Sequence, residues 1–345
     1  MKKTLSIILL SAMVMGITFT AKAVELVGAG ATFPYPLYSK MFDTYYQLKK
    51  VKVNYQSIGS GGGIKQLLSK TVHFGASDAV MEDEEKAKAG IKVHHIPTCF
   101  GADAITFNLP GVTKMNLTPD LIADIFLGKI TSWDDKRIAK VNPKIKFPKM
   151  PIVVVRRSDG SGTTYIFSDY LCKISSEWES KVGRGKSLNW PVGIGGKGNE
   201  GVSGLVKQTP GSIAYVELIY AIGNKMPVAS VQNLSGNFVY PSIQSVSESA
   251  NIELPDNTEV SITNTNAKNG YPISSFTWIL VYDDLSVLKM KDDEAKAMMN
   301  MLWWMIHDGQ KLVKPLHYAP LSPAAVKKAE GLLKSVKLNG KNILK

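Results

Sequence analysis

Residues 153–164 read VVVRRSDGSGTT, and the prediction of the fold starts from this stretch. It opens with consecutive valines, which are β-branched and belong to a continuous apolar run. Such a run is typical of a strand covered on both faces of a parallel sheet. Asp159-Gly160 breaks the strand, and an apolar helical pattern begins after Ser161. The stretch therefore predicts a strand, a turn and the start of a helix.

This unit offers a place for a small oxyanion at its turn. A helix begins with free backbone N–H groups and the positive end of its dipole. Ser161 and Thr163 add hydroxyl donors, and Gly162 lets a ligand approach the backbone. Arg157 or Arg156 could present the fork of N–H groups that binds a tetrahedral anion through two bonds.

Two earlier segments repeat the order of strand, glycine-rich turn and helix. In the first, a strand at 25–27 leads to Thr32 and Phe33, where an apolar helical stripe begins. Thr32 could cap that helix or donate to a ligand. In the second, Ser60 lies in GSGGG at 59–63, which we expect to be a flexible turn or an anion cradle before a helix. It is not a nucleotide P-loop, because no Gly-Lys-Ser/Thr closes it.

Asp78 follows a short strand at 72–76. In an α/β sheet, ligands bind at the carboxyl ends of the strands. An ordinary turn aspartate is the alternative for this residue. The candidate donors on neighbouring segments favour a role in ligand binding.

The sequence lacks the patterns that an enzyme or a metal centre would need. Ile58 and Asp159 occupy the first glycine positions of a G-x-S-x-G motif around Ser60 and Ser161. His94 and His95 are adjacent, so on a strand they point to opposite faces and do not form a metal pair. The other histidines are scattered without a ligand spacing. We therefore expect no catalytic residue, no metal and no cofactor, and an anion-binding site fits better than a catalytic one.

Residues 1–23 have the composition of a secretory signal peptide. They combine two early lysines, an apolar run at 5–19 and the cleavage signature Ala21-Lys22-Ala23. The run is short for a membrane anchor, and no cysteine follows it. We expect cleavage near Ala23, no lipid anchor, and a soluble periplasmic protein.

Charge and cysteine content argue against a nucleic-acid-binding protein and against a disulfide-rich or metal-cluster protein. The net charge of +12 falls to +9 when the three lysines of residues 1–23 are removed. The basic residues are spread along the chain, so we expect a solvated surface and no nucleic-acid partner. Cys99 and Cys172 are too few for a disulfide scaffold or a metal cluster. They could pair in an oxidising compartment, but we expect two separate buried thiols.

The last third of the chain gives weaker signals. Residues 230–270 are polar and have no strong period, so we expect loops and short elements there. A strong strand follows at 273–282, and helices are expected at 295–307 and 323–336.

Taken in order, the motifs resemble those of the periplasmic phosphate-binding proteins of bacterial ABC-type phosphate-uptake transporters. The matching segments are GAGATFP (28–34), NYQSIGSGGGIKQ (54–66), HFGASDAV (73–80), VVVRRSDGSGTTYIF (153–167), WPVGIGGKGNEGV (190–202), PGSIAYVE (210–217) and YPISSFTWILV (271–281). The resemblance covers essentially the whole mature chain. It implies an α/β periplasmic binding protein of type II, with two lobes, a ligand cleft between them and two crossover strands. Lobe one would comprise residues 24–103 and 275–345, and lobe two residues 104–274.

The resemblance also implies roles for single residues. Phosphate would receive hydrogen bonds from Thr32, Phe33, Ser60, Arg157, Ser161, Gly162 and Thr163. Asp78 would accept a hydrogen bond from a protonated phosphate oxygen, and Asp159 would hold the fork of Arg157 in place. The chain departs from the family at Gly61, where many relatives have a second serine, and at Val80, where proline is common. Glycine at 61 removes a hydroxyl donor but keeps the backbone N–H.

The function implied by the resemblance is capture of inorganic phosphate. The protein would act as a monomer and deliver phosphate to an inner-membrane complex of two permease subunits and an ATPase. A secreted phosphohydrolase or phosphotransferase could use the same cradle. Binding of sulfate, molybdate or a phosphonate is a further alternative, and so is a role in surface adhesion.

Overall fold

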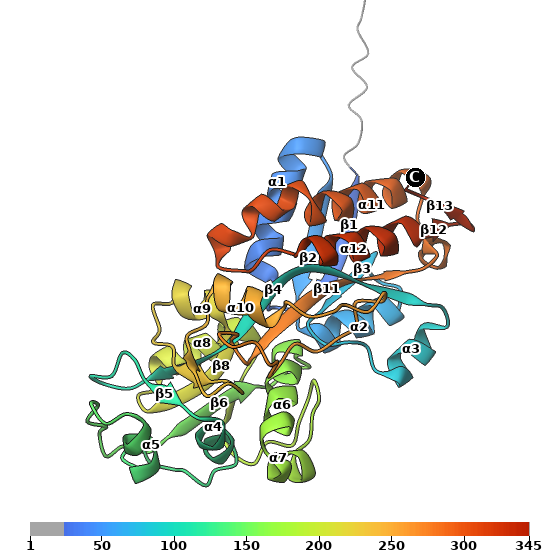
Figure 1. Ribbon diagram of the computed structural model, residues 1–345. Helices are drawn as coiled ribbons and strands as arrows, with labels where there is room; N and C mark the ends of the chain where they lie inside the picture. The colour runs from blue at the N-terminus through green and yellow to red at the C-terminus, as the bar shows by residue number, and fades with distance from the viewer. Residues whose placement is uncertain (1–23, 345) are drawn as a thin grey trace, which may run out of the picture.

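A mixed sheet of eight strands, in the order β2-β1-β3-β11-β4-β8-β6-β7, carries the fold. The computed structural model describes residues 24–344 (Figure 1). The predicted signal peptide, residues 1–23, lies outside the described residues. The strands of the sheet are β1 (Glu25–Gly30), β2 (Lys52–Ser57), β3 (Phe74–Ser77), β4 (Val93–Asn108), β6 (Val153–Arg157), β7 (Ile194–Gly196), β8 (Ser212–Glu217) and β11 (Ser274–Tyr282).

Helices pack around this sheet in both its upper and its lower part (Figure 1). They are α1 (Tyr35–Lys49), α2 (Ser60–Leu68), α3 (Asp83–Ala89), α4 (Pro119–Phe126), α5 (Lys136–Val141), α6 (Gly162–Ile174), α7 (Ser176–Lys181), α8 (Gly198–Gln208), α9 (Leu218–Gly223), α10 (Ile243–Ser249), α11 (Asp292–Ile306) and α12 (Pro323–Ser335). The short strands β5 (Asn116–Leu117), β9 (Ser230–Gln232) and β10 (Phe238–Val239) form a second sheet, and β12 (Lys337–Leu338) pairs with β13 (Lys341–Asn342). None of the helices between residues 24 and 344 has the length and apolar content that crossing a membrane requires.

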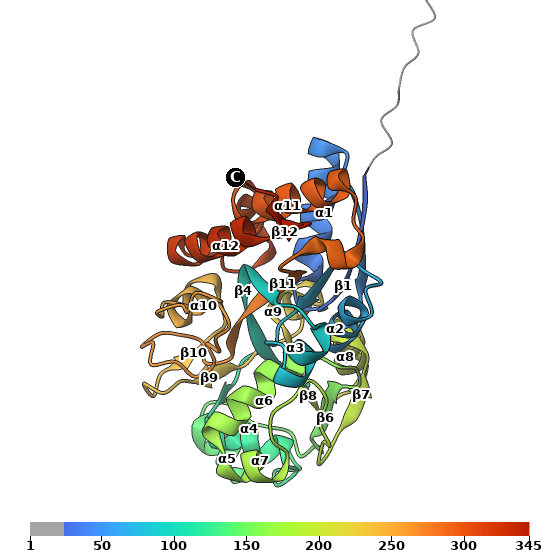
Figure 2. The same ribbon diagram turned by 90° about the vertical axis from the view of Figure 1, so that its right-hand side faces the viewer.

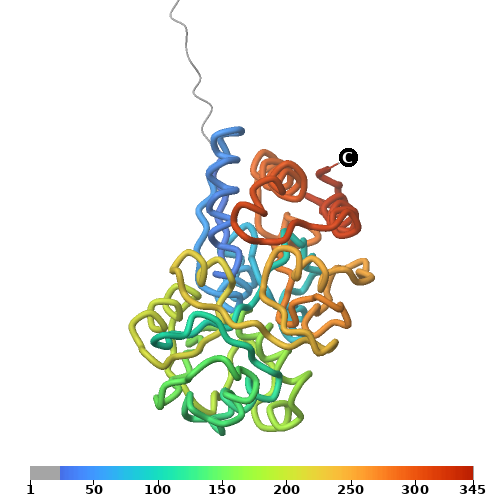
Figure 3. Tube along the Cα trace, turned by 60° about the vertical axis from the view of Figure 1, so that its left-hand side comes forward, coloured from blue at the N-terminus to red at the C-terminus, as the bar shows by residue number. Residues whose placement is uncertain are grey.

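The chain forms two lobes joined by two long strands. Figure 1 shows β1 and α1 together with α11 and α12 in the upper lobe, with α4 to α8 in the lower one, and the view in Figure 3 has the same division. Strand β4 has 16 residues and changes its partner along its length. Its residues 93–102 pair with β11, and its residues 103–108 pair with β8. The predicted fold class is therefore confirmed, including the two crossover strands.

The topology directs the carboxyl ends of parallel strands from both lobes toward the space between the lobes. In the upper lobe β1 pairs in parallel with β2 and β3, and in the lower lobe β6 pairs in parallel with β7 and β8. Each of the strands β1, β2, β3, β6 and β7 is followed by a turn, and ligands bind beside such turns in α/β sheets. Figure 2 shows α3 of the upper lobe directly above α6 of the lower lobe.

The segment 59–63 differs from the prediction of a loop. Helix α2 begins at Ser60, so its glycines form the first helical turn. Tertiary contact explains this, because a Cβ atom at Gly63 would lie 2.4 Å from Cα of Gly30. The glycines therefore allow α2 to lie directly against the end of β1, and the sequence pattern alone does not reveal that contact.

Two other expectations need correction. Cys99 is buried but Cys172 is partly exposed, so only one of the two free thiols is fully covered. The segment 230–270 contains only the short elements β9, β10 and α10 between loops, which confirms the prediction for it. Strand β9 is stabilised by pairing in parallel with the distant β5, a contact that no local pattern encodes. Helix α1 begins at Tyr35 with Pro34 as N-cap and no side-chain capping bond, so Thr32 does not cap it.

We expect Gly63→Ala to lower the free energy of unfolding by about 1–3 kcal/mol, because the added Cβ meets backbone atoms that cannot move away cheaply. Gly204 in α8 is the matched control, since a Cβ there meets nothing within 4 Å. Gly204→Ala should leave stability unchanged or raise it by up to about 1 kcal/mol. Urea denaturation of both variants checks this, and equal effects would contradict the packing described for α2.

Candidate functional site

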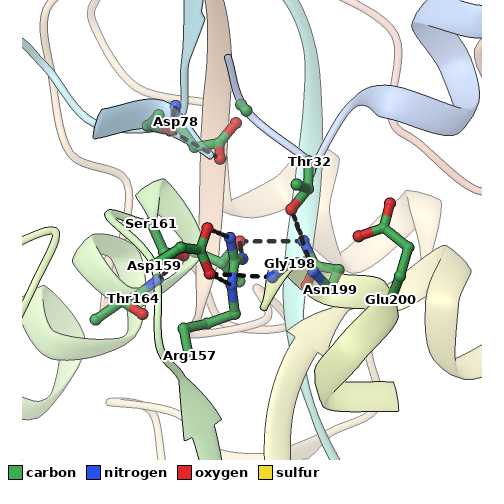
Figure 4. A network of polar contacts seen from close by, with 12 residues as sticks. Thr32, Asp78, Arg157, Asp159, Ser161, Thr164, Gly198, Asn199 and Glu200 are labelled. Atoms are coloured by element: carbon green, nitrogen blue, oxygen red, sulfur yellow. Dashed lines mark hydrogen bonds and ion pairs between the residues drawn. The ribbon is translucent and has the colours of Figure 1, made fainter. Parts of the chain in front are cut away.

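Polar residues from both lobes converge at the turns that follow the parallel strands. Figure 4 shows Asp78 and Thr32 on one side and Arg157, Asp159, Ser161 and Asn199 on the other. The predicted side chains are almost completely buried, with exposed fractions of 2% for Thr32 and Asp78, 3% for Arg157 and 0% for Ser60, Ser161 and Thr163. Polar groups buried this deeply need hydrogen-bond partners.

Arg157 is held as a fixed fork at the end of β6. Its Nε donates to Oδ1 of Asp159 (2.8 Å), its Nη2 donates to Oδ2 of the same carboxylate, and its Nη1 donates to Oγ1 of Thr163 (3.1 Å). A guanidinium has five N–H donors, so two remain for a ligand after these three bonds. The predicted ion pair between Arg157 and Asp159 is present.

The ion pair sets the charge state of both partners. Burial favours the neutral form of Asp159, but the hydrogen bonds and charge of Arg157 outweigh it and lower the pKa of Asp159. The N–H of Gly198 also donates to Oδ1 of Asp159 (3.0 Å). Burial opposes the charge on Arg157, and Asp159 outweighs that effect, so the pKa of Arg157 is raised. The site therefore holds a permanent cation whose charge is largely balanced by its own carboxylate.

Asp78 is the acceptor of the site. Its Oδ1 accepts from Oγ1 of Thr277 (2.7 Å), and its Oδ2 accepts from Oγ of Ser60 (3.4 Å). Burial raises the pKa of Asp78 to about 7, although Thr277, Arg157 and Ser60 act in the opposite direction. Near neutral pH this carboxyl can therefore change its protonation when a ligand arrives.

The N-terminus of α6 lies directly against Asp78 and Ser60. Ser161 is its N-cap, with Oγ accepting from the N–H of Thr164 (3.0 Å). A Cβ atom at Gly162 would lie 2.3 Å from Oγ of Ser60 and 2.6 Å from Oδ2 of Asp78. Glycine at this position is what allows the two lobes to bring the starts of α2 and α6 together. The first N–H groups of both helices have no intrahelical partners and lie beside this contact.

Thr32 is fixed by residues that the sequence analysis did not single out. Its Oγ1 accepts from Nδ2 of Asn199 (2.8 Å), and its backbone oxygen accepts from Oη of Tyr220 (2.6 Å). Nδ2 of Asn199 also lies 3.3 Å from Oγ1 of Thr163. A usable signal existed for Asn199, because β7, Gly198 and α8 repeat the strand–turn–helix pattern. No local signal marks Thr277 in the middle of β11.

Gly61 and Gly160 form the closest backbone contact between the two turns. The N–H of Gly61 donates to the oxygen of Gly160 (2.9 Å). A Cβ atom at Gly61 would lie 3.2 Å from Cα of Gly160. The N–H of Gly61 is therefore used between the turns, and a serine here would crowd the contact.

The arrangement brings several hydrogen-bond donors and one carboxyl acceptor together, which suits capture of an anion. Among residues 24–344 there is no group of three or more His, Cys, Asp or Glu residues that could hold a metal ion. Ser60 contacts Asp78, and Oγ of Ser161 contacts the N–H of Thr164, so neither hydroxyl has a histidine base in the described chain. The site combines several donors with one titratable acceptor.

Comparisons with known proteins place this geometry in a family. A family model described as a PBP superfamily domain matches residues 18–307. The phosphate-binding protein PstS of Xylella fastidiosa (strain Temecula1) is 44% identical over 316 residues, which cover 90% of this chain and 85% of the relative. The phosphate-binding protein PstS of Methanocaldococcus jannaschii is 39% identical and covers 84% of this chain and 80% of its own.

Solved structures agree in fold. A high-affinity periplasmic phosphate-binding protein with bound phosphate has a TM-score of 0.71 at 21% identity, covering 93% of this chain and 98% of its own. A putative phosphate ABC transporter substrate-binding protein from Clostridium perfringens, also with bound phosphate, has a TM-score of 0.64 at 20% identity, covering 86% of this chain and 100% of its own.

The raised pKa of Asp78 predicts a pH dependence of stability. Between about pH 4 and pH 7 the folded chain holds a proton on Asp78 that the unfolded chain has released, so the free energy of unfolding falls as pH rises. For a pKa of about 7 the full effect is about 4 kcal/mol and is reached above that pH. Asp78→Asn should lack this decline.

Urea denaturation at several pH values in phosphate-free buffer measures the difference between wild type and Asp78→Asn. Asp43→Asn, on the exposed face of α1, is the control and should follow the wild type. Parallel profiles for wild type and Asp78→Asn would show that Asp78 ionises in its ordinary range.

Proposed function

The chain belongs to the PstS family of phosphate-binding proteins within the PBP superfamily, and from that premise we propose that it binds inorganic phosphate in the periplasm for import by an ABC transporter. Relatives at 39–44% identity that align over most of both chains support the ligand. The observation that carries the proposal is the buried set of donors around Arg157 with a single carboxyl acceptor, Asp78.

The proposed ligand contacts follow from which donors remain free. Phosphate would accept from the two unused N–H groups of Arg157 and from backbone N–H groups at the starts of α2 and α6. Ser60, Gly162 and Thr163 would donate through their backbone N–H groups. Ser161 would donate through its hydroxyl, because its N–H already donates to the oxygen of Lys186. On the other side Thr32 and Phe33 would donate. Because Oγ1 of Thr32 accepts from Asn199, its own hydroxyl hydrogen is left to point at the ligand.

Asp78 would make the site selective for phosphate over sulfate. An ionised carboxylate accepts hydrogen bonds but cannot donate them. Phosphate keeps a proton near neutral pH and can donate to ionised Asp78. Sulfate would place acceptor against acceptor wherever Asp78 is ionised, which is above its pKa of about 7. A buried unpaired polar group costs about 1–3 kcal/mol and more when it is charged, so the expected preference is about tenfold to several hundredfold.

Affinity can be bounded from the same contacts. Hydrogen bonds to a charged group contribute about 1.5–3 kcal/mol each, and association costs about 4–15 kcal/mol. With about ten such bonds, micromolar or tighter binding, about −8 kcal/mol or beyond, is expected. Binding of this strength requires exclusion of water, which two lobes closing over the anion would provide.

The rest of the proposal concerns organisation and partners. Lobe one would comprise residues 24–103 and 275–345 and lobe two residues 104–274, which is supported by the change of partner of β4 between Ala102 and Asp103. The protein would reach the periplasm by cleavage near Ala23, without a lipid anchor. It would act as a monomer and pass phosphate to a membrane complex of two permease subunits and an ATPase. The absence of a histidine beside Ser60 or Ser161 in residues 24–344 favours binding over hydrolysis.

A calorimetric titration with phosphate, arsenate and sulfate tests the ligand and the role of Asp78 together. Wild type should bind phosphate with micromolar or tighter affinity and sulfate at least about tenfold more weakly. Asp78→Asn should narrow the gap between phosphate and sulfate, because its amide can donate to a fully ionised oxyanion. Asp43→Asn should keep the wild-type ratio.

Two results would contradict the proposal at different points. Failure of wild type to bind phosphate would remove the function itself. Tight phosphate binding with the same sulfate ratio in wild type and Asp78→Asn would keep the function and remove the role given to Asp78.

A further inference from the structure

Lys186 lies outside the proposed phosphate contacts but is fixed to the same turn. The N–H of Ser161, the N-cap of α6, donates to the backbone oxygen of Lys186 (2.8 Å). The backbone oxygen of Gly185 accepts from Oγ of Ser168 (3.4 Å), and the N–H of Gly185 donates to the same Oγ (3.2 Å). Ser168 lies about two helical turns further along α6. The segment that carries Lys186 is therefore attached to α6 at two points, and its position follows that of the anion turn.

The side chain of Lys186 crosses to the other lobe. Its Nζ donates to Oε1 of Glu82 (2.7 Å) and to Oε2 of Glu85 (3.0 Å) at the start of α3. The Lys186 side chain is 9% exposed, and that of Glu85 is 19% exposed. The pair with Glu85 is thus more deeply covered than an ordinary surface pair and is screened less by salt, whereas the side chain of Glu82 is 56% exposed.

The acceptors on α3 are held in position by contacts that do not involve Lys186. Glu85 receives the N–H of Glu82 at the same oxygen (2.9 Å), which forms the capping box of α3. Helix α3 begins five residues after Asp78, whose carboxyl is held by Thr277 and Ser60. A charge pair at this place therefore connects the turn of Ser161 on one lobe to the segment of Asp78 on the other.

We infer that Lys186 is a positioning residue that couples closure of the lobes to retention of the anion. The inference rests on the proposed function. In an open form the two lobes separate, and Lys186, Glu82 and Glu85 become fully solvated. The ion pair then stabilises only the closed form, and the apparent affinity of a ligand follows the population of the binding-competent form.

The position of the pair predicts its kinetic effect. Lys186 does not need to touch phosphate, so its loss leaves the donors around Arg157 and the acceptor Asp78 in place. The closed form opens more readily, and release accelerates more than capture slows, as is usual for changes at a docked interface. The effect also shrinks at high ionic strength, because the competing open form exposes separated charges.

The experiment compares Lys186→Gln with Lys181→Gln. Lys181 lies five residues away in the same lobe and pairs with Glu177 of its own helix at the surface, so its loss removes the same charge without a contact between lobes. The measurements are the calorimetric affinity for inorganic phosphate and the release rate of radiolabelled phosphate. We expect Lys186→Gln to bind about tenfold more weakly, mainly through faster release. Lys181→Gln should match wild type, and Lys186→Arg should recover most of the affinity.

A second variant, from the opposite lobe, controls for a local folding defect in Lys186→Gln. Glu82→Gln should weaken binding in the same direction, and the double variant with Lys186→Gln should lose less than the sum of the two single effects. Thermal unfolding without phosphate should be similar for wild type, Lys186→Gln and Lys181→Gln, since the pair acts on closure.

Each outcome decides the inference. Equal affinity and release rate for Lys186→Gln and Lys181→Gln, with tight binding by wild type, would overturn it and leave the proposed function intact. Additive effects of Glu82→Gln and Lys186→Gln would also overturn it. Absence of phosphate binding by wild type would instead remove the proposed function, and the coupling with it.

Discussion

The site depends on one buried ion pair, in which Asp159 holds the guanidinium of Arg157 at the end of β6. A cation with 3% exposure is costly unless it is paired and hydrogen-bonded. Asp159 meets that requirement and uses two of the donor groups, which leaves the others aimed in a fixed direction. Because the pair is nearly neutral, a bound dianion is stabilised mainly by hydrogen bonds and helix N-termini, and it can leave again when the lobes open.

Closure is built from close backbone contacts as much as from charges. Gly61 meets Gly160, and Gly162 meets Ser60 and Asp78, at distances that a side chain would block. Thr32 in turn is held from the opposite lobe by Asn199 and Tyr220. The crossover strands β4 and β11 connect the lobes behind these contacts. The same residues that would bind the anion therefore also bring the lobes together, which links occupancy to shape.

Local sequence patterns predicted the parts of the site that local physics determines. A β-branched run, a turn and a helix N-cap placed Ser161, Gly162 and Thr163 at the start of a helix, which the structure confirms, because each of these features acts over a few residues. The pairing of Arg157 with Asp159 was implied by the family resemblance, and the ion pair is present in the structure. The two-lobed fold came from the family resemblance, which the comparisons support.

Other features depend on contacts between distant segments and have no local signature. Thr277 lies in the middle of β11 and reaches Asp78 only because β11 is inserted beside β3. The sequence alone predicts a loop for the glycines at 61–63. Their helical conformation depends on contacts with the end of β1 and with the turn at Gly160. Lys186 lies in an irregular segment, and its partners on α3 are 101 and 104 positions away in sequence.

The central claim is that the anion lies between the lobes, with Asp78 as the acceptor of its proton. A crystal structure of the mature protein with phosphate tests it most directly. We expect one phosphate in contact with Arg157, with the N–H groups at the start of α6 and with Thr32. One phosphate oxygen should lie at hydrogen-bond distance from a carboxylate oxygen of Asp78, about 2.5–2.7 Å for a charge-assisted O–H···O bond. Phosphate bound elsewhere, or bound with Asp78 turned away from all of its oxygens, would contradict the claim.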